Sequence, residues 1–188
     1  MDGSDQLRGR LRAETRPHHQ RVDDAFAALD LGRAGDLTRF LAAQLSALEA
    51  LVPQDGPDCA EAEALAATTR AAIAADLRTL GAGPRARLAP QQADATAVLY
   101  VLLGSRLGAQ VLARRWLATA DALARGAGQY LTMDSQSARW RALCARLAAL
   151  PAAGAAGDAL VAQVGAIFDL YTAALERTPS AAQDRAYA

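Results

Sequence analysis

Lysine is absent from this chain of 188 residues, and histidine, cysteine and aromatic residues are scarce. All 20 basic residues are arginines, and they balance 20 acidic residues to a formal net charge of zero. A neutral chain is poorly suited to broad neutralisation of phosphates, so we expect no nucleic-acid partner. The two isolated cysteines, Cys59 and Cys144, exclude a cysteine zinc cluster and a disulfide framework, which favours a reducing compartment.

The only two histidines, His18 and His19, are adjacent, which disfavours a di-metal centre built from several histidines. Any chemistry that depends on an imidazole must therefore take place at this point of the chain. The polar N-terminal residues predict no secretory signal. The longest apolar run, residues 97–103, is far shorter than the roughly 20 residues of a membrane span. We expect a cytoplasmic protein with no membrane partner.

Alanine is the most abundant residue, with 49 copies, and together with the missing lysine it most simply reflects a GC-rich genome. Alanine, leucine, arginine, glutamate and glutamine all favour helices, and no apolar alternation is long enough for a strand. The sequence predicts an all-α, single-domain helical bundle over residues 1–179 and a flexible tail over residues 180–188. Helices are expected at residues 5–29, 37–51, 59–80, 91–127, 135–150 and 158–177.

Two local signals refine these boundaries. Pro17 marks either a kink in the first predicted helix or the true first turn of a helix, where proline is tolerated. Asp36 is expected to cap the second helix, because a carboxylate there can accept free backbone N–H groups.

The first candidate site lies on the first predicted helix, residues 11–23. Both His18 and His19 fit the apolar stripe, whose members are spaced by three and four residues, so periodicity does not choose between them. A neutral imidazole that faces the interior from a helix is the usual axial ligand of a haem iron. The ordinary alternative is a surface imidazole or a hydrogen-bonded core imidazole.

The second candidate site contains Gly104 and Gly108, one helical turn apart in an apolar segment. Each glycine inside a helix costs about 1 kcal/mol relative to alanine. In a chain so rich in alanine, this indicates that even a methyl group is excluded. Close helix packing, helix bending and a flat ligand lying on the backbone are all consistent with the pattern. Ser105 carries the only hydroxyl placed there for proton transfer.

The third candidate site is residues 139–146, where Trp140 stands among Arg139, Arg141 and Arg146. This pattern is typical of a solvated helix face with its tryptophan in the core, but the arginines could also anchor an anionic ligand. Neither cysteine has a histidine partner in the local sequence, so both are interpreted as structural.

Together, and in this order, the three segments resemble the haem oxygenase family, nearest its bacterial, bacteriophytochrome-associated branch. The family's first-helix pattern L-[basic]-x-x-T-x-x-x-H matches Leu11, Arg12, Thr15 and His19. The resemblance therefore gives the iron-ligand position to His19 rather than His18. The distal pattern G-[D or S]-x-x-G-[G or A]-Q matches Gly104, Ser105, Gly108, Ala109 and Gln110.

The resemblance implies a haem oxygenase-like fold with haem held between a proximal and a distal helix. Haem b would be both cofactor and substrate of an oxidoreductase that cleaves it with O2 to biliverdin, Fe2+ and carbon monoxide. Electrons would come from a ferredoxin or an NAD(P)H-dependent reductase, since the sequence has no flavin or iron–sulfur motif. A bacteriophytochrome would be the candidate acceptor of the biliverdin.

The resemblance also assigns site residues. The metal ligand would be His19, and the catalytic residues of the distal helix would be Gly104, Ser105 and Gly108. The cofactor-binding residues would be Arg12, Thr15, His19, Asp23, Tyr100, Gly104, Gly108, Ala109 and Arg141. Of these, Arg12 and Arg141 match basic positions that pair with the haem propionates.

The distal helix departs from the family at three positions. Ser105 stands where the animal-type enzymes have aspartate, Leu103 where the bacterial branch often has glutamate, and Ala109 where a second glycine is common. A non-catalytic or slow haem-binding or haem-sensing protein on the same fold is the alternative. A thiaminase-like hydrolase or a pyrroloquinoline-quinone-type oxidase is less favoured, because both cysteines look buried and unpartnered.

Overall fold

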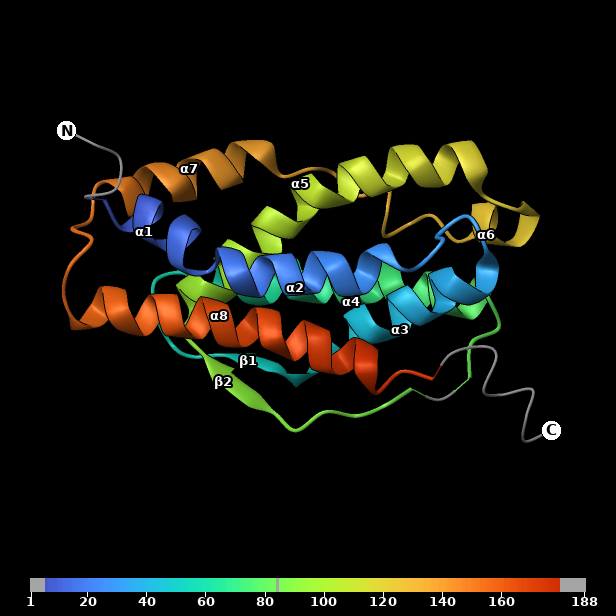
Figure 1. Ribbon diagram of the computed structural model, residues 1–188, viewed down its shortest axis with the longest axis horizontal. Helices are drawn as coiled ribbons and strands as arrows, with labels where there is room; N and C mark the ends of the chain where they lie inside the picture. Colours follow the sequence, from blue (N-terminus) through green and yellow to red (C-terminus); the bar gives the residue numbers. More distant parts are fainter. Residues whose placement is uncertain (1–5, 84, 180–188) are drawn as a thin grey trace.

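Helices make up most of the chain in the computed structural model, which describes residues 6–83 and 85–179 (Figure 1). This confirms the all-α prediction, while the predicted tail, residues 180–188, lies outside the described residues. The helices are α1 (Leu7–Glu14), α2 (Arg16–Ala27), α3 (Ala34–Ala50), α4 (Cys59–Thr79), α5 (Ala95–Thr119), α6 (Ala122–Gly126), α7 (Ser137–Ala148) and α8 (Ala155–Glu176). Two short strands are β1 (Leu51–Pro53) and β2 (Gln91–Ala93).

The core lies between α3, α4, α5 and α8, which pack against one another in pairs. It is built mainly from leucines, and each fully buried leucine or isoleucine contributes about 1.5–3 kcal/mol. Helix α2 lies beside α8, and α1 contacts both α7 and α8 (Figure 1). The largest fully buried apolar side chains are Leu11, Leu37, Leu41, Leu45, Leu48, Ile73, Leu99, Leu103, Leu131, Leu147 and Ile167.

The first predicted helix is in fact two helices, α1 and α2, joined at Thr15. The buried Thr15 hydroxyl donates to the Leu11 carbonyl oxygen at 2.7 Å and completes the end of α1. Pro17 lies in the first turn of α2, where its missing N–H has no helical partner to lose. Helix α2 therefore begins at Arg16 as a separate helix. None of its residues is fully buried, although Val22, Ala25 and Phe26 pack against the core.

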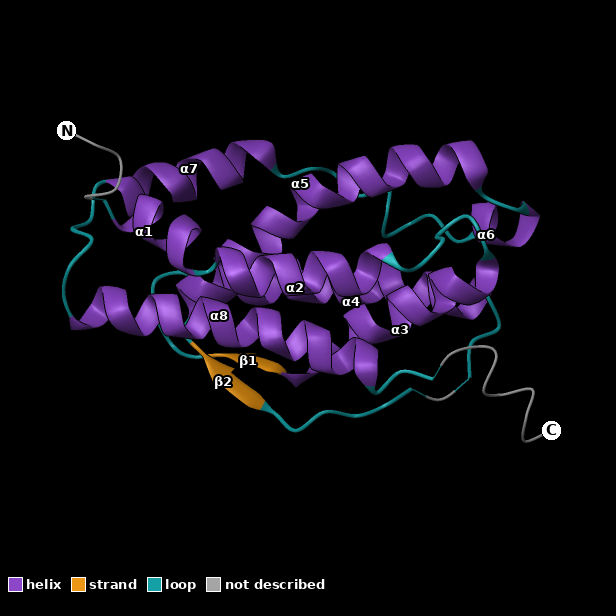
Figure 2. Cartoon of the chain, viewed as in Figure 1, coloured by secondary structure: helices purple, strands orange, loops and turns teal. Residues whose placement is uncertain are grey.

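The starts of α3 and α5 differ from the prediction for identifiable reasons. Helix α3 begins at Ala34, and the Asp36 carboxylate accepts the backbone N–H of Asp30 at 3.1 Å instead of capping the helix. Helix α5 begins only at Ala95, because residues 91–93 form β2, which pairs in parallel with β1 at the edge of the helical body (Figure 2). Strands of three residues are too short for apolar alternation to reveal them.

Asp121 stabilises the corner at which the predicted helix 91–127 divides into α5 and α6. Its carboxylate accepts the backbone N–H groups of Ala124 at 2.7 Å and Ala34 at 3.1 Å, which links this corner to α3. These hydrogen bonds hold the pKa of Asp121 below its ordinary value. A carboxylate with a lowered pKa stabilises the folded state above its unfolded pKa, and this contribution is lost as the pH falls through the folded pKa.

We therefore expect Asp121→Ala to lower the melting temperature near neutral pH. The difference from the unsubstituted protein should narrow below about pH 4, where the carboxyl group takes up its proton. Thermal unfolding followed by circular dichroism across this range measures both effects. Asp55→Ala, on an exposed loop, is the matched control and should leave the melting temperature unchanged. An equal loss at every pH would show that the Asp121 carboxylate has no part in the acid sensitivity.

Helices α5 and α8 are long and apolar enough to cross a membrane by length and composition. Half of the most apolar window of α5 and 39% of that of α8 are buried inside the protein. Core helices of a helical bundle pass the same test, so this is weak support for a membrane span.

Candidate functional site

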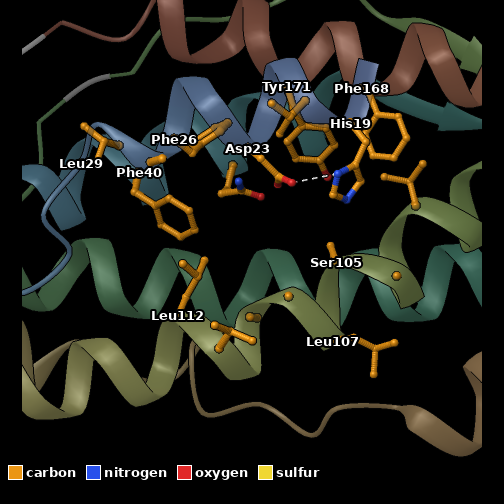
Figure 3. A pocket seen from close by; sticks show the side chains of 18 of the residues that line it. His19, Asp23, Phe26, Leu29, Phe40, Ser105, Leu107, Leu112, Phe168 and Tyr171 are labelled. Carbon is orange, nitrogen blue, oxygen red and sulfur yellow. Dashed lines mark ion pairs between the residues drawn. The ribbon is translucent and has the colours of Figure 1, made fainter. Parts of the chain in front are cut away.

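A cavity of about 1240 Å³ lies between α2 and α5, with walls completed by α1, α3, α7, α8 and the segment after α6. Figure 3 shows His19 and Asp23 of α2 on one side and Ser105 of α5 on the other. The residues predicted as a site lie far apart in the sequence, yet all of them except Arg141 line this cavity. They are Arg12, Thr15, His19, Asp23, Tyr100, Gly104, Ser105, Gly108 and Ala109.

Among the described residues, His19 is the histidine whose imidazole lines the cavity. Its Nδ1 lies 2.9 Å from the Asp23 carboxylate, one helical turn further along α2. Its ring makes an edge contact with Phe168 of α8, with ring centroids 5.2 Å apart (Figure 3). The side chains of His19 and Asp23 are both more than half exposed. A carboxylate this close to Nδ1 favours a proton on that nitrogen, which leaves the Nε2 lone pair for a metal.

His18 points away from the cavity toward α8. Its Nδ1 lies 2.9 Å from an oxygen of Asp169, and the same oxygen accepts a hydrogen bond from Arg21 at 2.7 Å. Burial alone would raise the pKa of Asp169, but these two partners hold it below its ordinary value. A Cβ on Gly165 would lie 3.2 Å from the His18 ring, so the missing side chain admits this imidazole. The structure thus distinguishes the two adjacent histidines, which the apolar periodicity alone did not: His19 lines the cavity and His18 contacts α8.

The two glycines of α5 are not required by protein packing. A Cβ built on Gly108 would meet no protein atom within 4 Å, and one on Gly104 would make only ordinary contact with Trp140 at 3.6 Å. Helix–helix packing therefore does not explain them. Figure 1 shows α5 bending along its length, and glycine eases a bend. The space over Gly108 remains open toward the cavity.

Ser105 cannot supply a proton to the cavity in this arrangement. Its hydroxyl donates to the Leu102 carbonyl oxygen of the same helix at 2.8 Å. A serine hydroxyl has one proton and two lone pairs, so only acceptor positions remain for a ligand. Gly104, Gly108 and Ala109 beside it have no side-chain donors.

One end of the cavity is basic. Arg8, Arg12 and Arg16 line it together with Tyr100 and Trp140, whose ring centroids are 5.1 Å apart. None of the three arginines forms an ion pair with a carboxylate among the described residues. Burial raises the pKa of Tyr100, while the charges of Arg8 and Arg12 oppose that shift. Unpaired guanidinium groups of this kind bind carboxylates through charge-assisted hydrogen bonds.

Arg141, which was predicted to bind the cofactor, does not line this cavity. Arg141 is exposed on the side of α7 away from the cavity, and its Nε donates to the Ser137 carbonyl oxygen at 3.3 Å. The neighbouring arginines have partners elsewhere. Arg139 pairs with Glu61 and Arg146 with Asp58, each at 2.7 Å. The rotation of α7 brings only Trp140, which is half-buried, to the cavity wall.

The two cysteines are free, and neither lines the cavity. Burial raises the pKa of the Cys144 thiol and that of the Cys59 thiol. A raised pKa keeps a thiol protonated and unreactive, in agreement with a structural role.

Sequence reasoning missed several residues of the cavity. Arg8 lies four residues before Arg12 on α1, so helical spacing could have found it, whereas Arg16 follows the break at Thr15 and belongs to α2. Tyr130, Phe168 and Tyr171 come from the segment after α6 and from α8, and no local pattern marks them. Their roles arise only from the way these segments pack beside α2 and α5.

The sequence matches no family model and none of the curated proteins. Among residues 6–83 and 85–179, no group of three or more histidine, cysteine, aspartate or glutamate side chains could hold a metal ion. For the described part of the chain, any functional argument therefore rests on the cavity and on the single imidazole of His19.

Proposed function

We propose that this protein is a haem oxygenase that binds haem b in the cavity between α2 and α5. The observation that carries the proposal is the pairing of His19, oriented by Asp23, with an α5 wall on which Gly108 leaves room that no protein atom fills. An imidazole on one face and bare backbone on the other suit a flat ligand with a metal at its centre.

The residues present fit haem in three respects. A porphyrin supplies four iron ligands itself, so a single protein imidazole is sufficient and His19 would provide it. The backbone at Gly104 and Gly108 would lie against the porphyrin face. Arg8, Arg12 and Arg16 would bind the propionates. The cavity of about 1240 Å³ exceeds the roughly 300–1,000 Å³ of ordinary small-molecule pockets and suits a larger ligand.

When bound, haem would supply the oxygen-activating iron and would also be the molecule cleaved to biliverdin, Fe2+ and carbon monoxide. The chain would contribute binding and orientation. Asp23 lies beside Nδ1 of His19, and Phe168 packs against the imidazole ring. Phe26, Phe40 and Leu112 form an apolar part of the cavity wall (Figure 3), and the cluster of Arg8, Arg12 and Arg16 would receive the propionates.

Electrons would come from a separate donor, a ferredoxin or an NAD(P)H-dependent reductase, since the sequence carries no flavin or iron–sulfur motif. A bacteriophytochrome is the proposed acceptor of the biliverdin. A cytoplasmic location and an origin in bacteria are part of the same proposal.

One observation favours a second candidate function, a haem-binding or haem-sensing protein without efficient turnover. The Ser105 hydroxyl donates its proton to the Leu102 carbonyl oxygen. The residues of α5 from Gly104 to Ala109 that line the cavity therefore give a ligand no side-chain hydrogen-bond donor. The two functions differ in turnover and can be separated by experiment.

The test is to reconstitute the purified chain with ferric haem and record its absorption spectrum before and after reduction in air. Ascorbate, or a ferredoxin with its reductase, supplies the electrons. We expect loss of the Soret band with growth of biliverdin absorption. A Soret band that persists under these conditions would favour the haem-binding protein, and failure to take up haem would contradict both functions.

A further inference from the structure

Arg106 of α5 is a buried cation without an acidic partner. It is 1% exposed, and it forms no ion pair among the described residues. Its Nη2 donates to the Tyr130 carbonyl oxygen at 2.9 Å and to that of Met133 at 3.5 Å. Its Nε and Nη1 are buried without any partner. Burying a charge in this way is costly, so its presence needs an explanation.

The guanidinium of Arg106 lies over the ring of Tyr130, 4.7 Å from the ring centroid. Tyr130 belongs to the segment between α6 and α7, and it lines the cavity. The buried Asp76 carboxylate of α4 accepts the backbone N–H groups of Gln129 at 2.9 Å and of Tyr130 at 2.8 Å. Side chains from α4 and α5 thus hold Tyr130 in one position at the cavity wall.

The phenol proton of Tyr130 has no acceptor among the described residues. Arginine has only donor atoms, so Arg106 cannot accept this proton. Tyr171 of α8 also lines the cavity, and its hydroxyl likewise has no acceptor among the described residues. The two tyrosines are 4% and 6% exposed and both line the cavity, so a ligand in the cavity can accept the proton of either phenol.

The two phenols differ in the charge beside them. Burial raises the pKa of both phenols, but the charge of Arg106 opposes this effect at Tyr130. At Tyr171 the neighbouring Tyr130 raises the pKa further. A cation beside a phenol strengthens the hydrogen bond that the phenol donates, and Tyr130 has such a cation over its ring.

We propose that the Tyr130 hydroxyl donates a hydrogen bond to the small ligand that haem iron carries inside the cavity, and that Arg106 is the positioning residue that holds Tyr130 there. This inference rests on the proposed function. It provides the donor that Ser105, whose proton is held by Leu102, does not. The buried charge of Arg106 is then retained for its effect on Tyr130.

Fluoride tests this directly, because it binds ferric haem as a small anion and accepts hydrogen bonds. In the haem-reconstituted protein, Tyr130→Phe removes only the hydroxyl and keeps the ring over Arg106. We expect its fluoride dissociation constant, measured by absorption titration, to rise about tenfold or more, as for loss of a hydrogen bond to a charged group. Haem affinity should change little. Tyr171→Phe is the matched control and should change fluoride affinity by less than about threefold.

Arg106→Lys keeps the charge but lacks the planar group over the ring, so fluoride affinity should fall part of the way toward that of Tyr130→Phe. Thermal unfolding establishes first that this variant is folded. If haem binds but Tyr130→Phe leaves fluoride affinity unchanged, the inference fails and the proposed function stands. Equal losses in the two tyrosine variants would also overturn it. If haem does not bind to the unsubstituted chain, the proposed function fails, and the inference with it.

Discussion

Alanine in place of Gly108 is expected to make the fold more stable and the cavity less able to bind haem. The added methyl group would meet no protein atom within 4 Å, so it causes no clash within the chain. Alanine is favoured over glycine in the middle of a helix by about 1 kcal/mol. In the proposed complex the methyl group would occupy the space of the porphyrin, so the same change removes room from the ligand.

Chemical denaturation should give Gly108→Ala a free energy of unfolding higher by about 0.5–1 kcal/mol. Haem titration should show an affinity lower by about tenfold or more, which corresponds to the roughly 1.4 kcal/mol of a modest steric conflict. Ala166→Gly, at an exposed position of α8, is the matched control. It should lower stability by a similar amount and leave haem affinity unchanged. If Gly108→Ala binds haem as well as the unsubstituted chain, Gly108 serves only the bend of α5.

Exchange of His19 for alanine should abolish the absorption spectrum of imidazole-ligated haem and, with it, haem turnover. No other imidazole lines the cavity among the described residues, because His18 is turned toward α8. Added imidazole should restore much of the spectrum, since the space that the side chain leaves is of its own size. This is the largest single effect that we expect from a substitution in this protein.

His18→Ala is the natural comparison for His19→Ala, since the two residues are neighbours on one helix. It removes the contact with Asp169 and Gly165, so we expect a small loss of thermal stability and an unchanged haem spectrum. Resonance Raman or absorption spectra of the two variants, recorded under the same conditions, show which of the two histidines binds the haem iron. Loss of the imidazole-ligated spectrum in His18→Ala, with its retention in His19→Ala, would contradict the arrangement of α2 described above.

The helical fold was predictable because its determinants are local. Helix-forming residues and their spacing define most helices to within a few residues. The break at Thr15 was not predictable, because it depends on a buried hydroxyl that bonds back to Leu11. The strands escaped prediction because β1 and β2 are each three residues long and pair across a large sequence separation.

The site was predictable on α2 and α5 but not elsewhere. His19, Gly104 and Gly108 belong to short sequence patterns. Within a helix, the spacing of such a pattern determines which residues share a face. Arg141 belongs to a similarly dense pattern, yet the rotation of α7 places it outside the cavity, and helical rotation is set by packing. Tyr130 reaches the cavity only through a segment held by Asp76 and Arg106, which no local pattern reveals.

Helix α2 has no fully buried residue, although it forms one wall of the cavity between α2 and α5. The side of α2 that does not pack on α8 and the core therefore faces the cavity. A ligand bound there would cover side chains of α2 and stabilise this helix. A ligand present at about a hundred times its dissociation constant would add about 2.7 kcal/mol to stability. Amide hydrogen exchange along α2 would then slow as ligand binds. The exchange rates of the rest of the bundle would depend on its own core instead.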